Sequence, residues 1–110
     1  YIAANGVKSK RPIAWCELLL GNFERSIEVY RQIIAASAKV DDVINLAHAL
    51  LCSGDVAAAI EEYRRAAAMS SVDNVHDTLC IDSALLLRLN VDQSLLSLIC
   101  DILVYGQEAL

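Results

Sequence analysis

The sequence contains a single proline, Pro12, and only 5% aromatic residues, whereas Ala and Leu are abundant. It shows no sustained alternation of polar and apolar residues, which is the pattern of a half-buried strand. The four glycines, at positions 6, 21, 54 and 106, fall between stretches whose apolar residues recur with helical spacing. These features argue against a β-rich fold and predict an all-α protein.

Long apolar runs are also missing, although 56% of the residues are hydrophobic. A membrane-spanning helix needs roughly 18–20 consecutive apolar residues. The run at 85–87 stops at Arg88, and the run at 95–103 contains Ser97 and Asp101. No basic-then-apolar leader opens the sequence. We therefore expect no membrane partner and a cytoplasmic location. The high apolar content indicates either packing on most sides or apolar faces that await further repeats.

Basic residues are too few to favour a nucleic-acid partner. The chain has 9 Lys and Arg against 14 Asp and Glu, a net charge of −5, and its one basic group, at 8–11, is small. An acidic surface repels phosphate. The motifs G-x-x-x-x-G-K-[ST], G-x-S-x-G and H-E-x-x-H are absent. We therefore predict no nucleic-acid partner, no catalytic residue and no cofactor, and regard the chain as a non-enzyme.

No pair of cysteines has C-x-x-C spacing. The cysteines are Cys16, Cys52, Cys80 and Cys100. Their separations match neither a zinc site nor a compact disulfide framework. Two interpretations stay open: metal or redox work, or four small buried thiols on helix faces in a reducing cytoplasm. Neither His48 nor His76 has a Cys or acidic residue at convincing ligand spacing, so no metal site is predicted.

An internal repeat of 33 residues is present. Gly21 and Gly54 are 54 − 21 = 33 positions apart, and a shift by that distance aligns identical residues on both sides. The identical pairs are Ala14 with Ala47, Leu18 with Leu51, Ile27 with Ile60, Glu28 with Glu61, Tyr30 with Tyr63, Arg31 with Arg64, Ala35 with Ala68 and Ser37 with Ser70. Repeats of this length are typical of stacked helix pairs.

Each unit is expected to be two antiparallel helices joined at a turn residue. The chain then forms a single domain, 1–110, with about six helices in three units: 7–39, 40–72 and a divergent 73–106. The third unit lacks the earlier pattern, but Asn90 stands 90 − 54 = 36 residues after Gly54, where a turn is needed. A divergent last unit is typical of the end of a repeat array.

Capping residues suggest where the later helices begin and end. Asp41 or Asp42 is expected to cap the first helix of the second unit, and Asp73 or Asn74 the first helix of the third. The last helix is expected to end at Gly106, because glycine readily adopts the conformation that terminates a helix.

Two groups of residues carry a family resemblance. They are Ile13-Ala14, Leu20-Gly21-Asn22-Phe23, Ser26-Ile27 and Tyr30 in the first unit, and Leu46-Ala47, Gly54-Asp55-Val56, Ala59-Ile60, Tyr63 and Ala66 in the second. In these residues the chain resembles the tetratricopeptide repeat (TPR) family, and its stretch at 11–16 is similar to bacterial TPR proteins of unassigned role. It departs from the family at Lys10 and Glu17, where aromatic residues are frequent, and at Ala38 and Ser71, where proline is usual. The resemblance implies an α-solenoid, a right-handed superhelical array of helix pairs.

The same resemblance implies a partner-binding groove, because in this family the first helix of each pair lines a concave surface that binds peptides or helices. The corresponding residues are Lys8, Arg11, Trp15, Leu18, Leu19, Ile44, Asn45, His48, Leu51 and Cys52. Trp15 would be the aromatic anchor of a mostly apolar face. The alternative is that Trp15 and its neighbours are covered by the chain's own helices or by an upstream repeat.

Some TPR proteins grip a C-terminal carboxylate with lysines and asparagines in the groove. Arg11 and Asn45 match two of those places, but Trp15 stands where a second asparagine is expected and the basic pair of the third unit is missing. A carboxylate clamp is therefore a weaker expectation than a general peptide groove.

Two functions follow from the resemblance. The first is a protein–protein interaction scaffold that binds a protein or peptide partner in the concave helical groove. The alternative is a structural self-assembly or capping segment of a longer TPR protein, in which apolar ends and the last helix pack against adjoining repeats or form a homo-oligomer. No residue pattern gives a positive reason for a third class, an enzyme or ligand sensor.

Overall fold

Six α-helices follow one another in the computed structural model, which describes the backbone of residues 7–108 and the side chains of residues 10–105. The helices are α2 (Val7–Leu19), α3 (Phe23–Ser37), α4 (Val40–Ser53), α5 (Val56–Met69), α6 (Val72–Arg88) and α7 (Gln93–Glu108). Between residues 7 and 108 there is no strand. The predicted all-α class and the expected six helices are confirmed.

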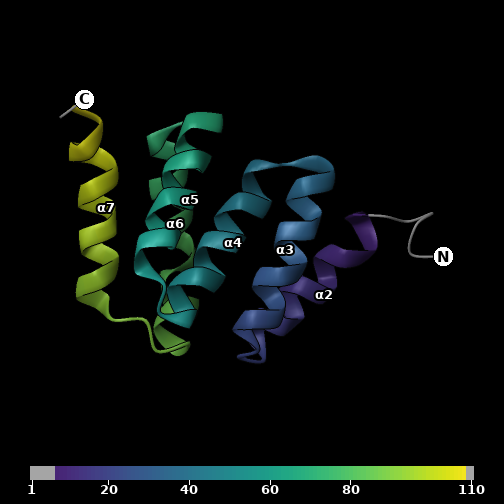
Figure 1. Ribbon diagram of the computed structural model, residues 1–110. Helices are drawn as coiled ribbons and strands as arrows, with labels where there is room; N and C mark the ends of the chain where they lie inside the picture. The colour runs from purple at the N-terminus through teal and green to yellow at the C-terminus, as the bar shows by residue number, and fades with distance from the viewer. Residues whose placement is uncertain (1–6, 109–110) are drawn as a thin grey trace.

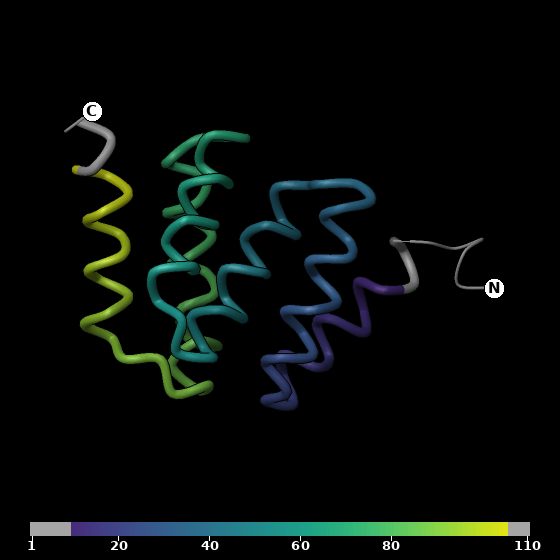
Figure 2. Tube along the Cα trace, viewed as in Figure 1, coloured from purple at the N-terminus to yellow at the C-terminus, as the bar shows by residue number. Residues whose placement is uncertain are grey.

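The helices form a row in which each packs mainly against its neighbours in sequence. Figure 1 shows α2 and α3 at one end of this row, α4 in the middle and α7 at the other end. Figure 2 traces the same path and shows the short connections that reverse the chain after each helix. Contacts between helices further apart in sequence join chiefly α4 to α6 and α5 to α7. The molecule measures 46 × 28 × 21 Å along its principal axes.

Left-handed residues turn the chain inside each helix pair. Gly21 (φ 84°) joins α2 to α3, Gly54 (φ 96°) joins α4 to α5, and Asn90 (φ 70°) follows α6. Glycine and asparagine tolerate positive φ better than other residues do. After α4, the backbone N–H of Asp55 donates to the Leu50 carbonyl at 3.0 Å, which pairs an otherwise free helix-terminal acceptor. The turn positions expected from the sequence are confirmed.

The start of α4 differs from the sequence-based expectation. Asp41 and Asp42 do not cap the helix, because it begins at Val40 and both aspartates lie in its first turn. Lys39 occupies the N-cap position and makes no side-chain capping bond. A negative charge in the first turn is still favourable beside the positive end of the helix dipole. The shift leaves the Asp42 carboxylate available for a contact with α2.

The expected ends of α6 and α7 are also corrected. Ser71 caps α6, because its hydroxyl accepts from the backbone N–H of Asn74 at 3.0 Å, so Asp73 and Asn74 lie inside the helix. A serine hydroxyl can bind the third backbone N–H of the helix as well as an aspartate can. Gly106 does not end α7, which continues to Glu108.

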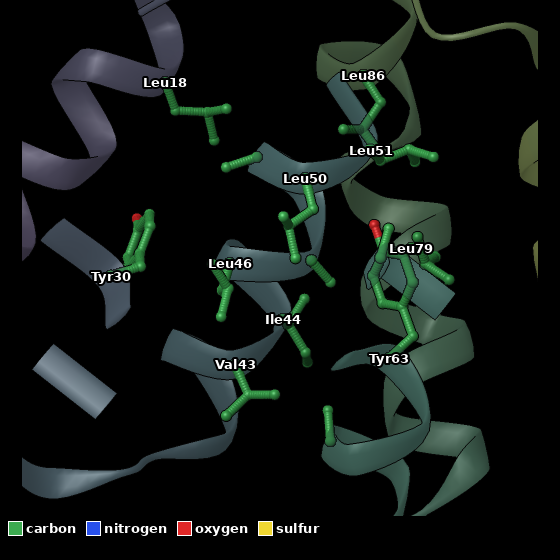
Figure 3. Packing of buried hydrophobic residues seen from close by; sticks show 14 of the residues in the cluster. Leu18, Tyr30, Val43, Ile44, Leu46, Leu50, Leu51, Tyr63, Leu79 and Leu86 are labelled. Carbon is green, nitrogen blue, oxygen red and sulfur yellow. The ribbon is translucent and has the colours of Figure 1, made fainter. Parts of the chain in front are cut away.

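The core runs along the row of helices, with α4 at its centre. Nine of the 14 residues of α4 are buried, so this helix is covered on most of its circumference. Figure 3 shows Leu46 and Leu50 of α4 between Tyr30 on one side and Tyr63 on the other. Five residue pairs related by the 33-residue repeat are buried in both units. These pairs are Ala14 with Ala47, Leu18 with Leu51, Ser26 with Ala59, Tyr30 with Tyr63, and Ile33 with Ala66.

Candidate functional site

Helix α2 presents Arg11 and Trp15 on one face, since residues four apart lie one turn above each other. The adjoining face carries Ala14 and Leu18, both fully buried against the rest of the protein. The Ser26 hydroxyl of α3 donates to the Ala14 carbonyl at 2.9 Å, and this buried bond fixes α2 against α3. Trp15 is half-buried and packs against the core. The rotation of α2 is therefore set by its core face.

A bidentate ion pair joins α2 to α4. Arg11 Nε donates to both oxygens of Asp42, at 2.9 and 3.2 Å, and Arg11 Nη2 donates to Oδ2 at 2.7 Å. The Asp42 side chain is 4% exposed, against 29% for Arg11. A buried carboxylate needs such a partner because it has lost its hydration. The hydrogen bond to Asp42 raises the pKa of Arg11.

An open pocket of about 450 Å³ lies between α2, α3 and the start of α4. Its lining residues are Arg11, Pro12, Trp15, Tyr30, Lys39, Asp41, Asp42 and Asn45. Burial, and next the charge of Asp42, raise the pKa of the Tyr30 phenol, so the hydroxyl stays protonated at neutral pH. The pocket therefore combines an indole ring, an amide and a hydroxyl with a neutralised ion pair.

Three predicted site residues meet in this pocket. Arg11 and Trp15 come from α2 and Asn45 comes from α4. Lys39 and Asp41 are exposed and give the pocket one cation and one anion beyond the ion pair. Because Asp42 already binds the Arg11 guanidinium, a carboxylate from a partner would have to compete with it. This geometry counts against a carboxylate clamp.

The other predicted site residues do not share this surface. Leu18, Ile44, His48 and Leu51 are at most 3% exposed, so their assignment to an open groove is corrected: they belong to the core. The physical reason is that α3, α5 and α6 all pack on α4, which carries the last three, and that Leu18 of α2 packs into the same core. Leu19 is 45% exposed and Cys52 is half-buried, and neither lines the pocket. The side chain of Lys8 lies outside the described residues.

No protein-family model, curated protein or solved structure matches this chain. The TPR resemblance therefore stays a prediction, and the functional argument depends on the geometry of the chain itself.

A buried hydrogen-bonded chain is the main polar feature that sequence reasoning missed. His48 Nδ1 lies 2.6 Å from the Tyr63 hydroxyl, and His48 Nε2 lies 2.9 Å from Asp82 Oδ2. An ionised carboxylate only accepts, so Nε2 carries the proton, and in the neutral ring Nδ1 then accepts from the tyrosine. The three hydrogen-bonded side chains come from α5, α4 and α6, and they join these helices. Desolvation by burial raises the pKa of Tyr63 well above its ordinary value.

Solvent reaches these three hydrogen-bonded side chains at one end only. His48 and Tyr63 are 0% exposed, whereas the Asp82 side chain is 26% exposed. A substrate cannot reach the imidazole or the phenol without moving α4, α5 or α6. The arrangement therefore links helices, and reactivity of these groups is blocked by packing.

Among the described side chains, no three or more His, Cys, Asp or Glu residues gather closely enough to hold a metal ion. Helices α2–α7 all lack the combination of length and apolar character that crossing a bilayer requires.

The cysteines correct one interpretation of the sequence. Cys16 and Cys80 are exposed, so the expectation of four buried thiols is wrong for these two. Cys52 and Cys100 are half-buried. Burial raises the pKa of Cys52 to about 11, which keeps this thiol protonated at neutral pH.

Proposed function

We propose that this chain is a protein-interaction module of the tetratricopeptide type that holds an extended segment of a partner protein in the pocket between α2, α3 and α4. One observation carries the proposal. Arg11, Trp15 and Asn45, chosen from the sequence as lining a common surface, come from two different helices and line one open pocket.

The repeat pattern supports the family part of the proposal. Five residue pairs related by 33 positions are buried in both of the first two helix pairs, and Gly21 and Gly54 have the same left-handed conformation. Stacked helix pairs of about this length, each contacting mainly its neighbours, are the architecture of helical repeat proteins. A solenoid of three TPR-like units, 7–39, 40–72 and 73–106, is the arrangement that these features favour.

The pocket suits an extended segment with one apolar or aromatic side chain. The indole of Trp15 supplies a flat apolar surface, and the Asn45 amide can both donate and accept, as a peptide backbone requires. Arg11 uses Nε and Nη2 on Asp42 and retains further N–H donors for a backbone carbonyl. Because the ion pair fixes Arg11 in advance, little side-chain entropy is lost on binding.

Peptide selection on the whole chain tests this proposal. Trp15 is the only tryptophan, so its fluorescence reports on the pocket. We expect peptides selected from a random displayed library against the wild-type chain to shift this fluorescence. We expect Asn45→Ala to weaken their binding about tenfold or more, as for a central contact worth over 1.4 kcal/mol. Arg64→Ala on the exposed face of α5 is the matched control and should change nothing.

Two results would reject the groove. One is that no selected peptide shifts the fluorescence of Trp15; the other is that Asn45→Ala and Arg64→Ala bind every selected peptide as the wild type does. Circular dichroism of each variant is required, because a change in helix content would explain lost binding without any role for the pocket.

A specific observation favours the second function, a self-assembly or capping segment. Helix α7 carries Leu95, Leu98, Ile102 and Tyr105 at spacings of three and four residues, and Leu98 and Tyr105 are 51% and 64% exposed. Such a stripe is the seam that helices use to pack against one another. Sedimentation equilibrium tests it: we expect concentration-dependent association that Leu98→Glu abolishes, and a monomeric wild type up to millimolar concentration would eliminate this function.

A further inference from the structure

Two cysteines lie at the same level of the antiparallel pair α6 and α7. Cys80 is 88 − 80 = 8 residues before the end of α6, and Cys100 is 100 − 93 = 7 residues after the start of α7. At a rise of about 1.5 Å per residue, both are about 10–12 Å from the turn that joins the two helices. Residues 80 and 100 therefore lie at the same level along the axis of the helix pair.

Both cysteines also line one pocket, of about 340 Å³, at the junction of these helices. Its other lining residues are His76, Leu79, Ser83, Gln93, Leu96, Ser97 and Asp101. Cys80 is exposed and Cys100 is half-buried. Burial, and next the charge of Cys80, raise the pKa of the Cys100 thiol, and the second effect requires the two sulfurs to be near one another. The two residues thus share a side of the helix pair as well as a level.

An imidazole stands beside the exposed thiol. His76 lies one helical turn before Cys80, and its Nδ1 is 3.9 Å from the Cys80 sulfur. An imidazole at this position can take the thiol proton, and the thiolate is the form that attacks a disulfide. Of the exposed cysteines, Cys80 therefore has both a base and a second thiol nearby, whereas Cys16 lies at the far end of the row on α2.

We propose that Cys80 and Cys100 are a redox-active dithiol, which a low-molecular-weight disulfide such as oxidised glutathione converts to an intramolecular bridge between α6 and α7. The Cys80 thiolate attacks one sulfur of the small disulfide, forms a mixed disulfide and releases one small thiolate. Cys100 then loses its proton and attacks the Cys80 sulfur, which breaks the mixed disulfide and releases the second small thiolate. The two protein thiols are oxidised by two electrons, and their two protons end on the two small thiols.

The order of attack follows from exposure. Cys80 is open to solvent, so a small disulfide can reach it. Cys100 is half-buried and its pKa is raised, so Cys80 attacks first and Cys100 attacks the mixed disulfide that forms beside it. The bridge would tie α7 to the body of the protein. Without it, α7 is held chiefly by packing on α6 and α5.

Tryptic mapping of the oxidised chain tests the dithiol. Cleavage after Arg65 and Arg88 places Cys80 on peptide 66–88 and Cys100 on the peptide that begins at residue 89. After treatment of the monomer with oxidised glutathione and alkylation of free thiols, we expect mass spectrometry without reductant to find these two peptides linked. The linked chain should melt about 10–15 °C higher, because the bridge closes a loop of some 20 residues.

Single substitutions separate the two steps. With Cys100→Ser, we expect glutathione to stay on Cys80 as a stable mixed disulfide. Cys16→Ser is the matched control and should leave the bridge unchanged. Two outcomes would overturn the proposal: glutathione that persists on Cys80 of the wild type while Cys100 is alkylated, or bridges that join two chains and never Cys80 to Cys100 of one chain.

Discussion

Replacement of Tyr63 by phenylalanine removes one hydroxyl from the buried chain that joins α4, α5 and α6. The ring of Tyr63 is 0% exposed and stays in place in the variant, so packing is conserved. What changes is His48, whose Nδ1 loses its partner at 2.6 Å inside a site that solvent does not reach. The variant therefore isolates one hydrogen bond.

The expected loss can be worked from these contacts. A net hydrogen bond contributes about 0.5–1.5 kcal/mol, and a buried acceptor left unpaired costs about 1–3 kcal/mol. We therefore expect Tyr63→Phe to lower the free energy of unfolding by about 1.5–2.5 kcal/mol. The matched control is Tyr30→Phe, its repeat equivalent, whose hydroxyl pairs with the amide of Asn45, a half-buried residue that can turn to water instead. The control should cost about 0.5 kcal/mol, near the low end of that range.

Urea unfolding followed by circular dichroism measures both variants, with the midpoint and the slope fitted together. A double-mutant cycle with His48→Leu tests the coupling directly: Tyr63→Phe should cost at least about 1 kcal/mol less when the imidazole is absent. Equal losses for Tyr63→Phe and Tyr30→Phe, together with no coupling to His48, would refute the reasoning that this chain of bonds stabilises the fold.

Three further predictions concern single sites. Arg11→Met leaves the buried Asp42 carboxylate without its bidentate partner and should lower the free energy of unfolding by about 2–4 kcal/mol, measured by urea denaturation. Gly54→Ala should cost about 1–2 kcal/mol, because φ is 96° although an added Cβ meets nothing within 4 Å; thermal unfolding checks this. Cys52 has a pKa raised from 9.0 to about 11, so stability should be full below pH 9 and fall as pH rises to 11, and Cys52→Ser should remove that part of the decline.

Each of these predictions has a control in the same chain. Arg25→Ala breaks an exposed pair with Glu28 at 3.6 Å and should lower the free energy of unfolding by less than about 0.5 kcal/mol. If Arg11→Met lowers it by no more than Arg25→Ala does, the argument for the buried pair is contradicted. Asn90→Gly removes a side chain at a positive φ, whereas Gly54→Ala adds one. A loss of stability in Asn90→Gly would count against the strain argument. Cys16→Ser changes an exposed thiol and should leave the pH profile as it is.

The helices and turns were predictable because they depend on residues close together in the chain. Apolar spacing placed α5 at Val56–Met69, and the glycines at 21 and 54 marked two left-handed turns. Helix ends were less predictable, since Ser71 and Asp73 are both good caps and only the path of the backbone decides between them. The end of α7 could not be predicted from Gly106 either, because this glycine lies within the helix.

The candidate site was predictable only in part. Arg11, Trp15 and Asn45 could be placed together because the repeat assigns them to the first helices of successive pairs. The burial of Ile44 could not be read from the pattern of α4, which does not say how many helices pack on it. Asp82 could not be paired with any residue, since its partner is 34 positions away and the third unit does not follow the 33-residue spacing.

The preference of each helix for its neighbours in sequence has a consequence for how the protein is made. Contacts that are local in the chain require the closure of short loops only, so folding does not wait for the pairing of distant segments. Helices α2 and α3 can pack as soon as both have left the ribosome, and α4 can then join them before α7 is synthesised. The apolar surface of α4 that faces α3 is thereby covered early, which shortens the time during which this part of the nascent chain could aggregate.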